Sequence, residues 1–340
     1  MKKITFLLCT GFLVVACGTS QEKSTTKNNA DTVLEYAKTI TASELKDALY
    51  TYASDEFEGR KTGEPGQKKA IEFIKNHYVN IGLPSPIAEG DYFQEIPKEF
   101  FNGRAKASSE NVVAFLKGTE KPDEIIVISA HLDHIGISKN GDINNGADDD
   151  GSGTVAVLEI AEAFKAAADK GNGPKRSILF LHVTAEEIGL FGSKYYADVD
   201  PIFPLANTVA DLNIDMIGRV DPKHEDNRNY LYLIGADKLS TELHNISEAI
   251  NEKYFKMEFD YTYNDENDPN RFYYRSDHYN FAKNNIPVIF YFNGTHADYH
   301  RPSDTPDKIE YDLLETRTRL VFHTAWELAN RDERIVVDKK

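Results

Sequence analysis

Four short segments of the chain are mainly hydrophobic and rich in β-branched residues. They span residues 124–130, 177–183, 208–214 and 286–292. Runs of this kind, apolar on both faces, are typical of strands inside a sheet that is covered on both sides. The hydrophobic pattern therefore predicts a buried sheet built from at least these four segments.

Segments with hydrophobic residues at helical spacing lie before and between these runs. The predicted helices span residues 41–53, 67–81, 153–168, 239–254, 278–283 and 313–330. The first begins with a capping box, because Thr41 precedes Glu44 by three residues. Residues 221–228 and 264–271 are polar and are predicted as loops. The alternation predicts a single-domain, three-layer α/β/α fold, with a central mixed, mostly parallel sheet flanked by helices.

The first 17 residues have the pattern of an export signal. Two lysines precede an apolar run from Ile4 to Ala16, which is too short to be a permanent transmembrane helix. The run ends at Cys17 and resembles a bacterial lipoprotein signal, in which this cysteine becomes the lipidated first residue; a plain signal peptide is the alternative. We expect three regions: a signal peptide (1–16), a lipid-anchored polar tether (17–34) and a folded domain (35–340).

These features predict a protein of the bacterial cell envelope, exported and anchored to a membrane through a lipid on Cys17, facing the periplasm or the cell surface. The chain has 39 Lys and Arg against 55 Asp and Glu, a net charge of −16. Loss of residues 1–16 removes two lysines and gives −16 − 2 = −18. This charge argues against a nucleic-acid partner and against docking through a polybasic patch. The pattern predicts no particular oligomeric state.

Residues able to bind metal follow the predicted strands. The motifs are HLDH at 131–134, GADDDGSG at 146–153, AEE at 185–187, DMIG at 215–218 and YH at 299–300. Since α/β sheets place their sites at the carboxyl ends of the strands, we expect these side chains to lie together. Cys9 leaves with the signal, so zinc would have to be bound by histidines and carboxylates.

The order of these motifs resembles the co-catalytic di-zinc aminopeptidase family, which also includes glutamate carboxypeptidase and the transferrin receptor. The similarity covers roughly residues 105–330. It implies two zinc ions per chain and peptide substrates with a free N-terminus. By this resemblance, His131 and Asp215 belong to the first zinc site, Glu187 and His300 to the second, and Asp149 bridges the two.

The resemblance also implies the catalytic roles. Glu186 matches the general base that acts on a zinc-activated water, and Asp133 matches the residue that orients His131. Tyr299 matches a tyrosine that steadies the tetrahedral intermediate in some members. The peptide bond of 149–150 matches a cis bond in the family. The implied activity is hydrolytic removal of the N-terminal residue from peptides.

Three other functions remain open on the same fold. A glutaminyl cyclase would work with one zinc, a carboxypeptidase would act at the other end of the peptide, and a non-catalytic receptor would lack ligands. The complete ligand set favours the peptidase. Ser276, Asp277 and His278 are spaced like part of a hydrolase triad, but no Gly-x-Ser-x-Gly turn lies nearby, so we interpret them as a helix start capped by Ser276 or Asp277.

Two further predictions concern packing. His182 lies inside a predicted strand and is interpreted as a core histidine. Aromatic residues are dense between residues 254 and 274, where we expect mostly core or strand. As a hypothesis, Tyr273 and Tyr274 line the pocket for the first side chain of the substrate.

Overall fold

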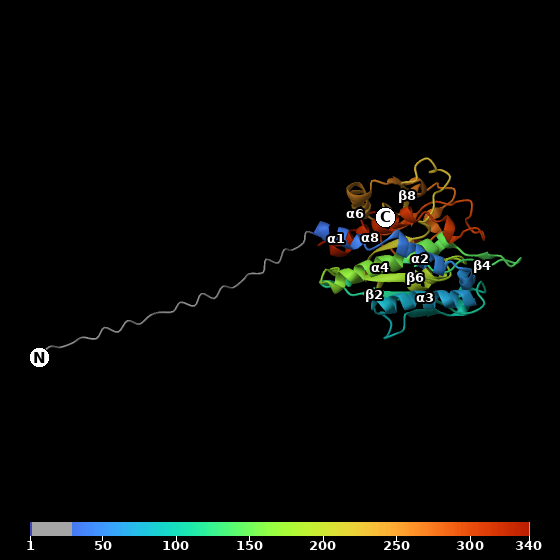
Figure 1. The fold of residues 1–340 in the computed structure, drawn as a ribbon, viewed down its shortest axis with the longest axis horizontal. Coiled ribbons are helices and arrows are strands. Elements are labelled where there is room, and N and C mark those ends of the chain that lie inside the picture. The colour runs from blue at the N-terminus through green and yellow to red at the C-terminus, as the bar shows by residue number, and fades with distance from the viewer. Residues whose placement is uncertain (2–28, 340) are drawn as a thin grey trace.

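An eight-stranded mixed sheet forms the centre of the molecule, with the strand order β1-β2-β6-β3-β7-β10-β8-β9. The strands are β1 (Phe93–Ile96), β2 (Ser109–Leu116), β3 (Lys121–His131), β6 (Arg176–Val183), β7 (Thr208–Ile214), β8 (Tyr230–Ile234), β9 (Glu258–Asp260) and β10 (Val288–Phe292). The central strands β6, β3, β7 and β10 are parallel, β1 and β2 pair antiparallel with their neighbours, and β8 is antiparallel to β10 and parallel to β9. In Figure 1, β2 and β6 lie towards the bottom and β8 near the top. A separate hairpin joins β4 (Gly136–Ile137) to β5 (Ile143–Asn144).

The computed structural model describes Met1 and residues 29–339. The predicted signal peptide and the lipid on Cys17 lie outside these residues. The helices are α1 (Asn29–Ala37), α2 (Ala42–Tyr52), α3 (Pro65–Ile81), α4 (Gly153–Asp169), α5 (Phe191–Asp198), α6 (Thr241–Ile250), α7 (His278–Ala282) and α8 (Tyr311–Asn330). None of these described helices is long and apolar enough to cross a membrane.

The two faces of the sheet are buried against different helices. On β3, Ile126 and Ile128 belong to the large core cluster that also contains residues of α2, α3, α4 and α8. Ile125 and Val127 point the other way, into a cluster with residues of α5 and α7. Alternate residues of a strand face opposite sides, so every second side chain joins the same cluster. Complete burial of one such side chain contributes about 1.5–3 kcal/mol.

The predicted three-layer α/β/α fold with a mixed, mostly parallel sheet is confirmed. The four predicted strands correspond to β3, β6, β7 and β10, and each predicted helix is present within a few residues. At the start of α2, the backbone N–H of Glu44 donates to Thr41 Oγ1 at 3.2 Å, which confirms the predicted cap. Strands β1, β2, β8 and β9 and helices α1 and α5 were not predicted.

The packed part of the chain begins earlier than residue 35. Helix α1 begins at Asn29 and buries Val33, Tyr36 and Ala37 against the main core. Its contacts are with α4 and α8, which lie far along the chain. The polar segment that precedes the domain therefore ends before α1, and residues 29–34 belong to the folded body.

Candidate metal centre

The predicted metal ligands lie at the carboxyl ends of the central parallel strands. His131 is the last residue of β3, and Asp215 follows directly after β7. Glu187 lies in the turn after β6, and His300 in the loop after β10. Asp149 lies in the turn formed by Ala147–Ser152, which leads into α4. Parallel strands end at the same edge of a sheet, and this brings residues separated by up to about half the chain to one place.

The five predicted ligands form two groups that share one carboxylate. His131 Nε2 lies 3.2 Å from Asp149 Oδ1 and 3.6 Å from Asp215 Oδ1. His300 Nε2 lies 3.1 Å from Asp149 Oδ2 and 3.2 Å from Glu187 Oε2. The two oxygens of Asp149 therefore face different groups, as a carboxylate that bridges two cations must do.

The chemistry of these atoms fits a pair of divalent cations. His131 Nε2, Asp149 Oδ2 and Glu187 Oε1 are buried and have no hydrogen-bond partner within the described chain. Unpaired buried polar atoms are rare because each carries a desolvation penalty of about 1–3 kcal/mol. Imidazole nitrogens and carboxylate oxygens are ligands that Zn²⁺ accepts. The residues present therefore fit the two zinc ions that the resemblance implies.

The electrostatics of the site also call for added positive charge. Burial lowers the pKa of His300, but the neighbouring carboxylates of Asp149 and Glu187 outweigh this effect and raise the pKa to about 10. Burial also raises the pKa of Asp133 to about 6. The raised pKa of His300 therefore reflects a group of carboxylates that is stabilised by a proton or by another cation.

Asp150 lies beside the predicted ligands, but its carboxylate oxygens accept hydrogen bonds from backbone N–H groups. Its oxygens lie close to His131 and Asp215, so it belongs geometrically to a group of possible ligands. However, Asp150 accepts backbone N–H bonds from His131 at 3.2 Å, Gly153 at 2.9 Å and Met216 at 3.1 Å. These bonds tie the ends of β3 and β7 to the start of α4. Asp150 thus braces this turn, and the bridging role of Asp149 stays a prediction; the peptide bond between the two residues is cis, as the resemblance implied.

His134 is a candidate that the sequence interpretation did not assign. Its Nδ1 lies 2.7 Å from Glu187 Oε1 and 3.8 Å from Asp149 Oδ2, and its Nε2 is buried without a partner in the described chain. The side chain is placed to orient Glu187 or to contact a cation itself. The signal in the sequence was its position three residues after His131, in the same turn at the end of a strand.

Asp133 contacts His131 through its main chain. His131 Nδ1 lies 3.0 Å from the backbone oxygen of Asp133, whereas the nearest carboxylate oxygen is 3.9 Å away. The carboxylate accepts instead from the backbone N–H of Glu186 at 3.1 Å and from Thr62 Oγ1 at 2.7 Å. Asp133 thus connects the turn after β3 to the turn that carries Glu186, and orientation of His131 by its carboxylate stays a prediction.

The segment from Ser276 to His278 supports the centre. Ser276 Oγ donates to Asp215 Oδ2 at 2.6 Å, and Asp277 Oδ1 accepts from Ser193. Helix α7 begins at His278 with Asp277 at its N-cap position, as predicted, but without a side-chain hydrogen bond from that cap. Long-range partners take up these buried side chains, because a buried polar group left without a hydrogen-bond partner carries a desolvation penalty. The His278 ring stacks on Phe290, with centroids 4.8 Å apart, and contacts no nucleophile.

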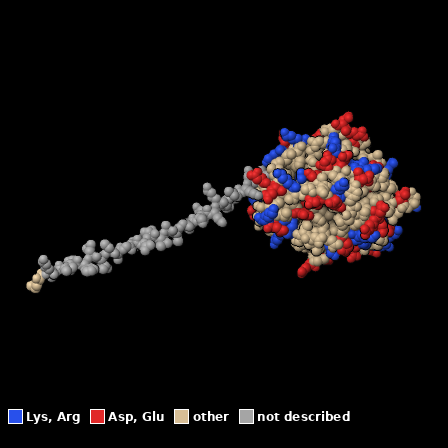
Figure 2. All heavy atoms as spheres, viewed as in Figure 1, with Lys and Arg blue, Asp and Glu red and all other residues tan. Residues whose placement is uncertain are grey.

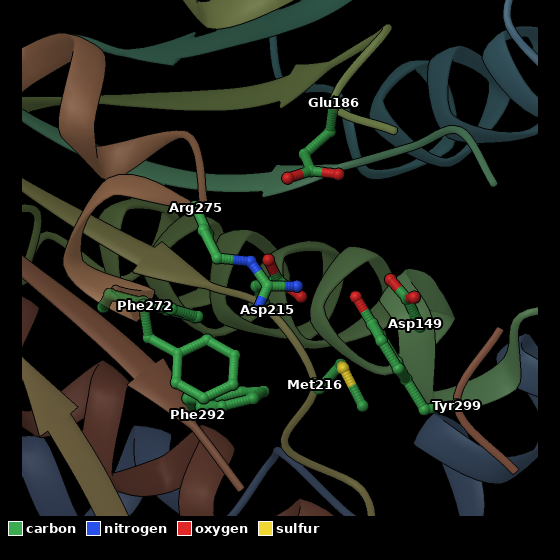
Figure 3. A pocket seen from close by; sticks show the side chains of 9 residues that line it. Asp149, Glu186, Asp215, Met216, Phe272, Arg275, Phe292 and Tyr299 are labelled. Atoms are coloured by element: carbon green, nitrogen blue, oxygen red, sulfur yellow. The ribbon is translucent and has the colours of Figure 1, made fainter. Parts of the chain in front are cut away.

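Glu186 and Tyr299 line the same hollow, the pocket beside the metal centre, as the predicted ligands Asp149 and Asp215. Both line a small pocket of about 30 Å³ and a wider cleft of about 660 Å³ next to it. Figure 3 shows Glu186 and Tyr299 on different sides of the pocket, with Asp149 and Asp215 between them in the view. Burial raises the pKa of Glu186 well above its usual range, and nearby carboxylates add to the shift. A carboxyl group with a raised pKa is suited to exchanging a proton near neutral pH.

The aromatic residues divide between the pocket and the core. Phe272, which was expected to be core or strand, lines the small pocket together with Phe290 and Phe292. Tyr274 lines the cleft, whereas Tyr273 packs beside the buried clusters. His182 is fully buried on β6, 2.7 Å from the hydroxyl of Tyr78, which confirms its interpretation as a core histidine.

The chain is similar in sequence to known proteins. The chain is 31% identical over 174 residues to leupeptin-inactivating enzyme 1 of Streptomyces exfoliatus, covering 51% of this chain and 35% of that one. It is 26% identical over 240 residues to aminopeptidase YwaD of Bacillus subtilis, covering 68% and 48%. The chain thus spans between about a third and a half of the length of these two relatives.

Solved structures share the fold. LapB from Legionella pneumophila superposes with a TM-score of 0.70 at 21% identity, covering 89% of this chain and 76% of that one. BSAP, a zinc aminopeptidase from Bacillus subtilis, gives a TM-score of 0.66 at 17% identity, covering 88% and 99%. The sequence profile of peptidase family M28 matches residues 111–325. Because this match covers more than half of the chain and includes every predicted ligand, the chain belongs to peptidase family M28.

Proposed function

We propose that this protein is a zinc-dependent aminopeptidase that removes the first residue of peptides with a free N-terminus. The observation that carries the proposal is the pair of ligand groups sharing Asp149, with Glu186 facing the same hollow. His131, Asp149 and Asp215 would hold one cation, and Asp149, Glu187 and His300 the other. The relatives named as aminopeptidases support the choice of reaction.

Different groups would carry out the separate steps of hydrolysis. Zinc, when bound, would polarise the scissile carbonyl and acidify water. Glu186 would accept the proton that the attacking water loses and then give it to the nitrogen of the departing amine, so that water and peptide become a free amino acid and a shortened peptide. Tyr299 would donate its hydroxyl proton in a hydrogen bond to the former carbonyl oxygen. The surrounding carboxylates suit the free ammonium group of the substrate.

The first test compares two neighbouring glutamates. In Glu186→Gln, we expect two zinc ions per chain to remain and turnover of leucyl and alanyl amides to fall by about 10²–10⁴, the range typical of a lost general base. In Glu187→Gln, we expect zinc content itself to fall. Glu99→Gln, an exposed change away from the hollow, is the matched control. Unchanged turnover in Glu186→Gln would remove Glu186 from this role.

The second test separates the related functions. An aminopeptidase should cleave a free peptide and leave its N-acetylated form intact, whereas a carboxypeptidase should cleave both. One zinc per chain together with cyclisation of N-terminal glutamine would favour a cyclase instead. Metal analysis and product identification on the same sample distinguish these outcomes.

We also propose that residues 1–16 are removed and that Cys17 carries a lipid that holds the protein at the cell envelope. The basic and apolar start of the chain and the small residues before Cys17 support this proposal. In a bacterial host, wild-type protein should label with a fatty acid and sediment with membranes. Cys17→Ala should do neither, while Cys9→Ala, altered within the removed segment, should behave as wild type. Equal membrane association of both variants would contradict the anchor.

A further inference from the structure

Arg275 reaches into the pocket beside the candidate metal centre. It lies between the turn Phe272–Tyr274 and helix α7, and it lines both the small pocket and the wider cleft. Figure 3 shows its guanidinium extending into the middle of the pocket, toward the space that Glu186 and Asp215 also face. Ser276, the next residue, donates to Asp215, so the backbone that carries Arg275 is fixed to the metal centre.

The guanidinium of Arg275 has no acidic partner. Among residues 29–339, no carboxylate oxygen lies within 4.0 Å of it, and its contact is the face of the Phe272 ring, 4.8 Å from the ring centroid. Arg219 and Arg228, by contrast, pair with carboxylates at 3.1 Å and 2.5 Å. A guanidinium stacked on a ring keeps its N–H donors free at the edges, in the planar arrangement that matches a carboxylate.

We propose that Arg275 makes the enzyme select substrates whose first residue is Asp or Glu, an inference that rests on the proposed aminopeptidase function. Phe272, Phe290 and Phe292 would pack against the methylene groups, and the guanidinium would pair with the side-chain carboxylate.

The charges around the hollow permit an acidic substrate. The four innermost carboxylates, Asp149, Glu186, Glu187 and Asp215, carry a formal −4, which two divalent cations would balance. A second arginine, Arg104, lines the cleft and donates to the backbone oxygen of Ile188 at 2.6 Å. Its positive charge adds to the potential that attracts an anionic group.

The test uses full-length, zinc-loaded protein and three tripeptides that differ only in the first residue: Glu-Ala-Ala, Gln-Ala-Ala and Leu-Ala-Ala. Glu and Gln have nearly the same shape, so their ratio of kcat/KM isolates the charge. We expect wild type to favour Glu by at least about tenfold, the range of a charge-assisted hydrogen bond. Arg275→Gln should abolish this preference and keep its zinc, and Arg275→Glu should shift preference toward Lys-Ala-Ala.

Arg271→Gln is the matched control. Arg271 is also exposed and also stacks on a ring, 4.9 Å from the centroid of Tyr274, but it lines neither the pocket nor the cleft. The control should retain the wild-type Glu to Gln ratio. If wild type cleaves Leu and Gln peptides as well as Glu and Arg275→Gln changes nothing, the inference is overturned while the aminopeptidase function stands. If wild type cleaves none of the peptides, both are overturned.

Discussion

Replacement of Arg60 by methionine should both destabilise the fold and loosen the metal centre. Arg60 is fully buried and donates to the backbone oxygens of Tyr52 at 3.3 Å, Leu132 at 3.2 Å, Asn145 at 2.6 Å and Gly146 at 2.8 Å. Its guanidinium also lies over the Tyr52 ring, 4.6 Å from the centroid. One side chain thus joins the turn that follows His131 to the turn that precedes Asp149.

The size of the effect follows from which oxygens lose their donors. Leu132 O also accepts from the Tyr52 hydroxyl at 2.7 Å, and Gly146 O also accepts from the Gly151 N–H at 3.1 Å, so these two keep a partner. Asn145 O loses the charged donor at 2.6 Å. Tyr52 O also loses its Arg60 donor at 3.3 Å, so two buried oxygens are orphaned and two others each lose one charge-assisted bond; offset by removal of a buried cation, this gives about 3 kcal/mol. For a chain of this size that corresponds to a fall in Tm of roughly 6 °C.

The assay is urea and thermal unfolding followed by circular dichroism, on zinc-loaded and on chelated protein. The loss of unfolding free energy in the chelated protein measures the effect of the substitution on the fold alone. Any additional loss in the zinc-loaded protein measures its effect on the metal centre. Arg319→Met is the control, because Arg319 also donates to a backbone oxygen, that of Ile40 at 2.7 Å, but is partly exposed, so we expect a loss of at most about 1 kcal/mol. Equal stability of the Arg60 and Arg319 variants, with unchanged zinc affinity, would refute the reasoning.

Three further predictions concern other parts of the molecule. Ser276→Ala removes the hydroxyl that donates to Asp215 at 2.6 Å and should weaken zinc binding by about 10–100-fold in a chelator competition; unchanged affinity would contradict this. Burial lowers the pKa of His182 to about 3. The unfolded chain therefore takes up the proton first, near pH about 6.5, and the protein loses stability as the pH falls below that value, at about 1.4 kcal/mol per unit. Between pH 7.5 and 5.0, wild type should lose about 2 kcal/mol more unfolding free energy than His182→Gln, and parallel losses would show that His182 is not buried in its neutral form. Gly153→Ala places a methyl carbon 2.5 Å from Asp150 Oδ2 and 2.7 Å from Ile214 O, so urea unfolding should show a loss of about 1–3 kcal/mol, and a neutral result would mean that this turn yields easily.

The central strands were predictable because they are buried on both faces. Residues such as Ile126 and Val127 are apolar whichever way they point, so a continuous apolar run marks the strand without knowledge of its neighbours. The edge strands β1 and β9 were missed for the opposite reason. β9 has only three residues, none of them fully buried, and β1 has four, alternating between buried and exposed positions. Their pairing depends on a neighbour that the local pattern does not contain.

The ligand residues were identified through the order of the motifs, but their detailed geometry was not. Nothing in the sequence says that the two oxygens of Asp149 face different groups, or that Asp133 meets His131 through its main chain. His134 and Arg275 were not singled out, because an isolated histidine or arginine is usually an ordinary polar residue.

The sequence by itself determined the α/β class, the central strands, the predicted export signal and the set of histidines and carboxylates that follow the strands. These features are local, since they depend on residue type and on spacing over a few positions. Tertiary structure decided which side chains meet. Ser276 and Asp215 are 61 residues apart and Arg60 and Gly146 are 86 apart, and only the packing of the whole sheet and its helices brings each pair into contact. A buried polar atom forms its hydrogen bond with whichever group the fold places beside it. Ser276, for example, donates to the buried carboxylate of Asp215 and does not cap helix α7.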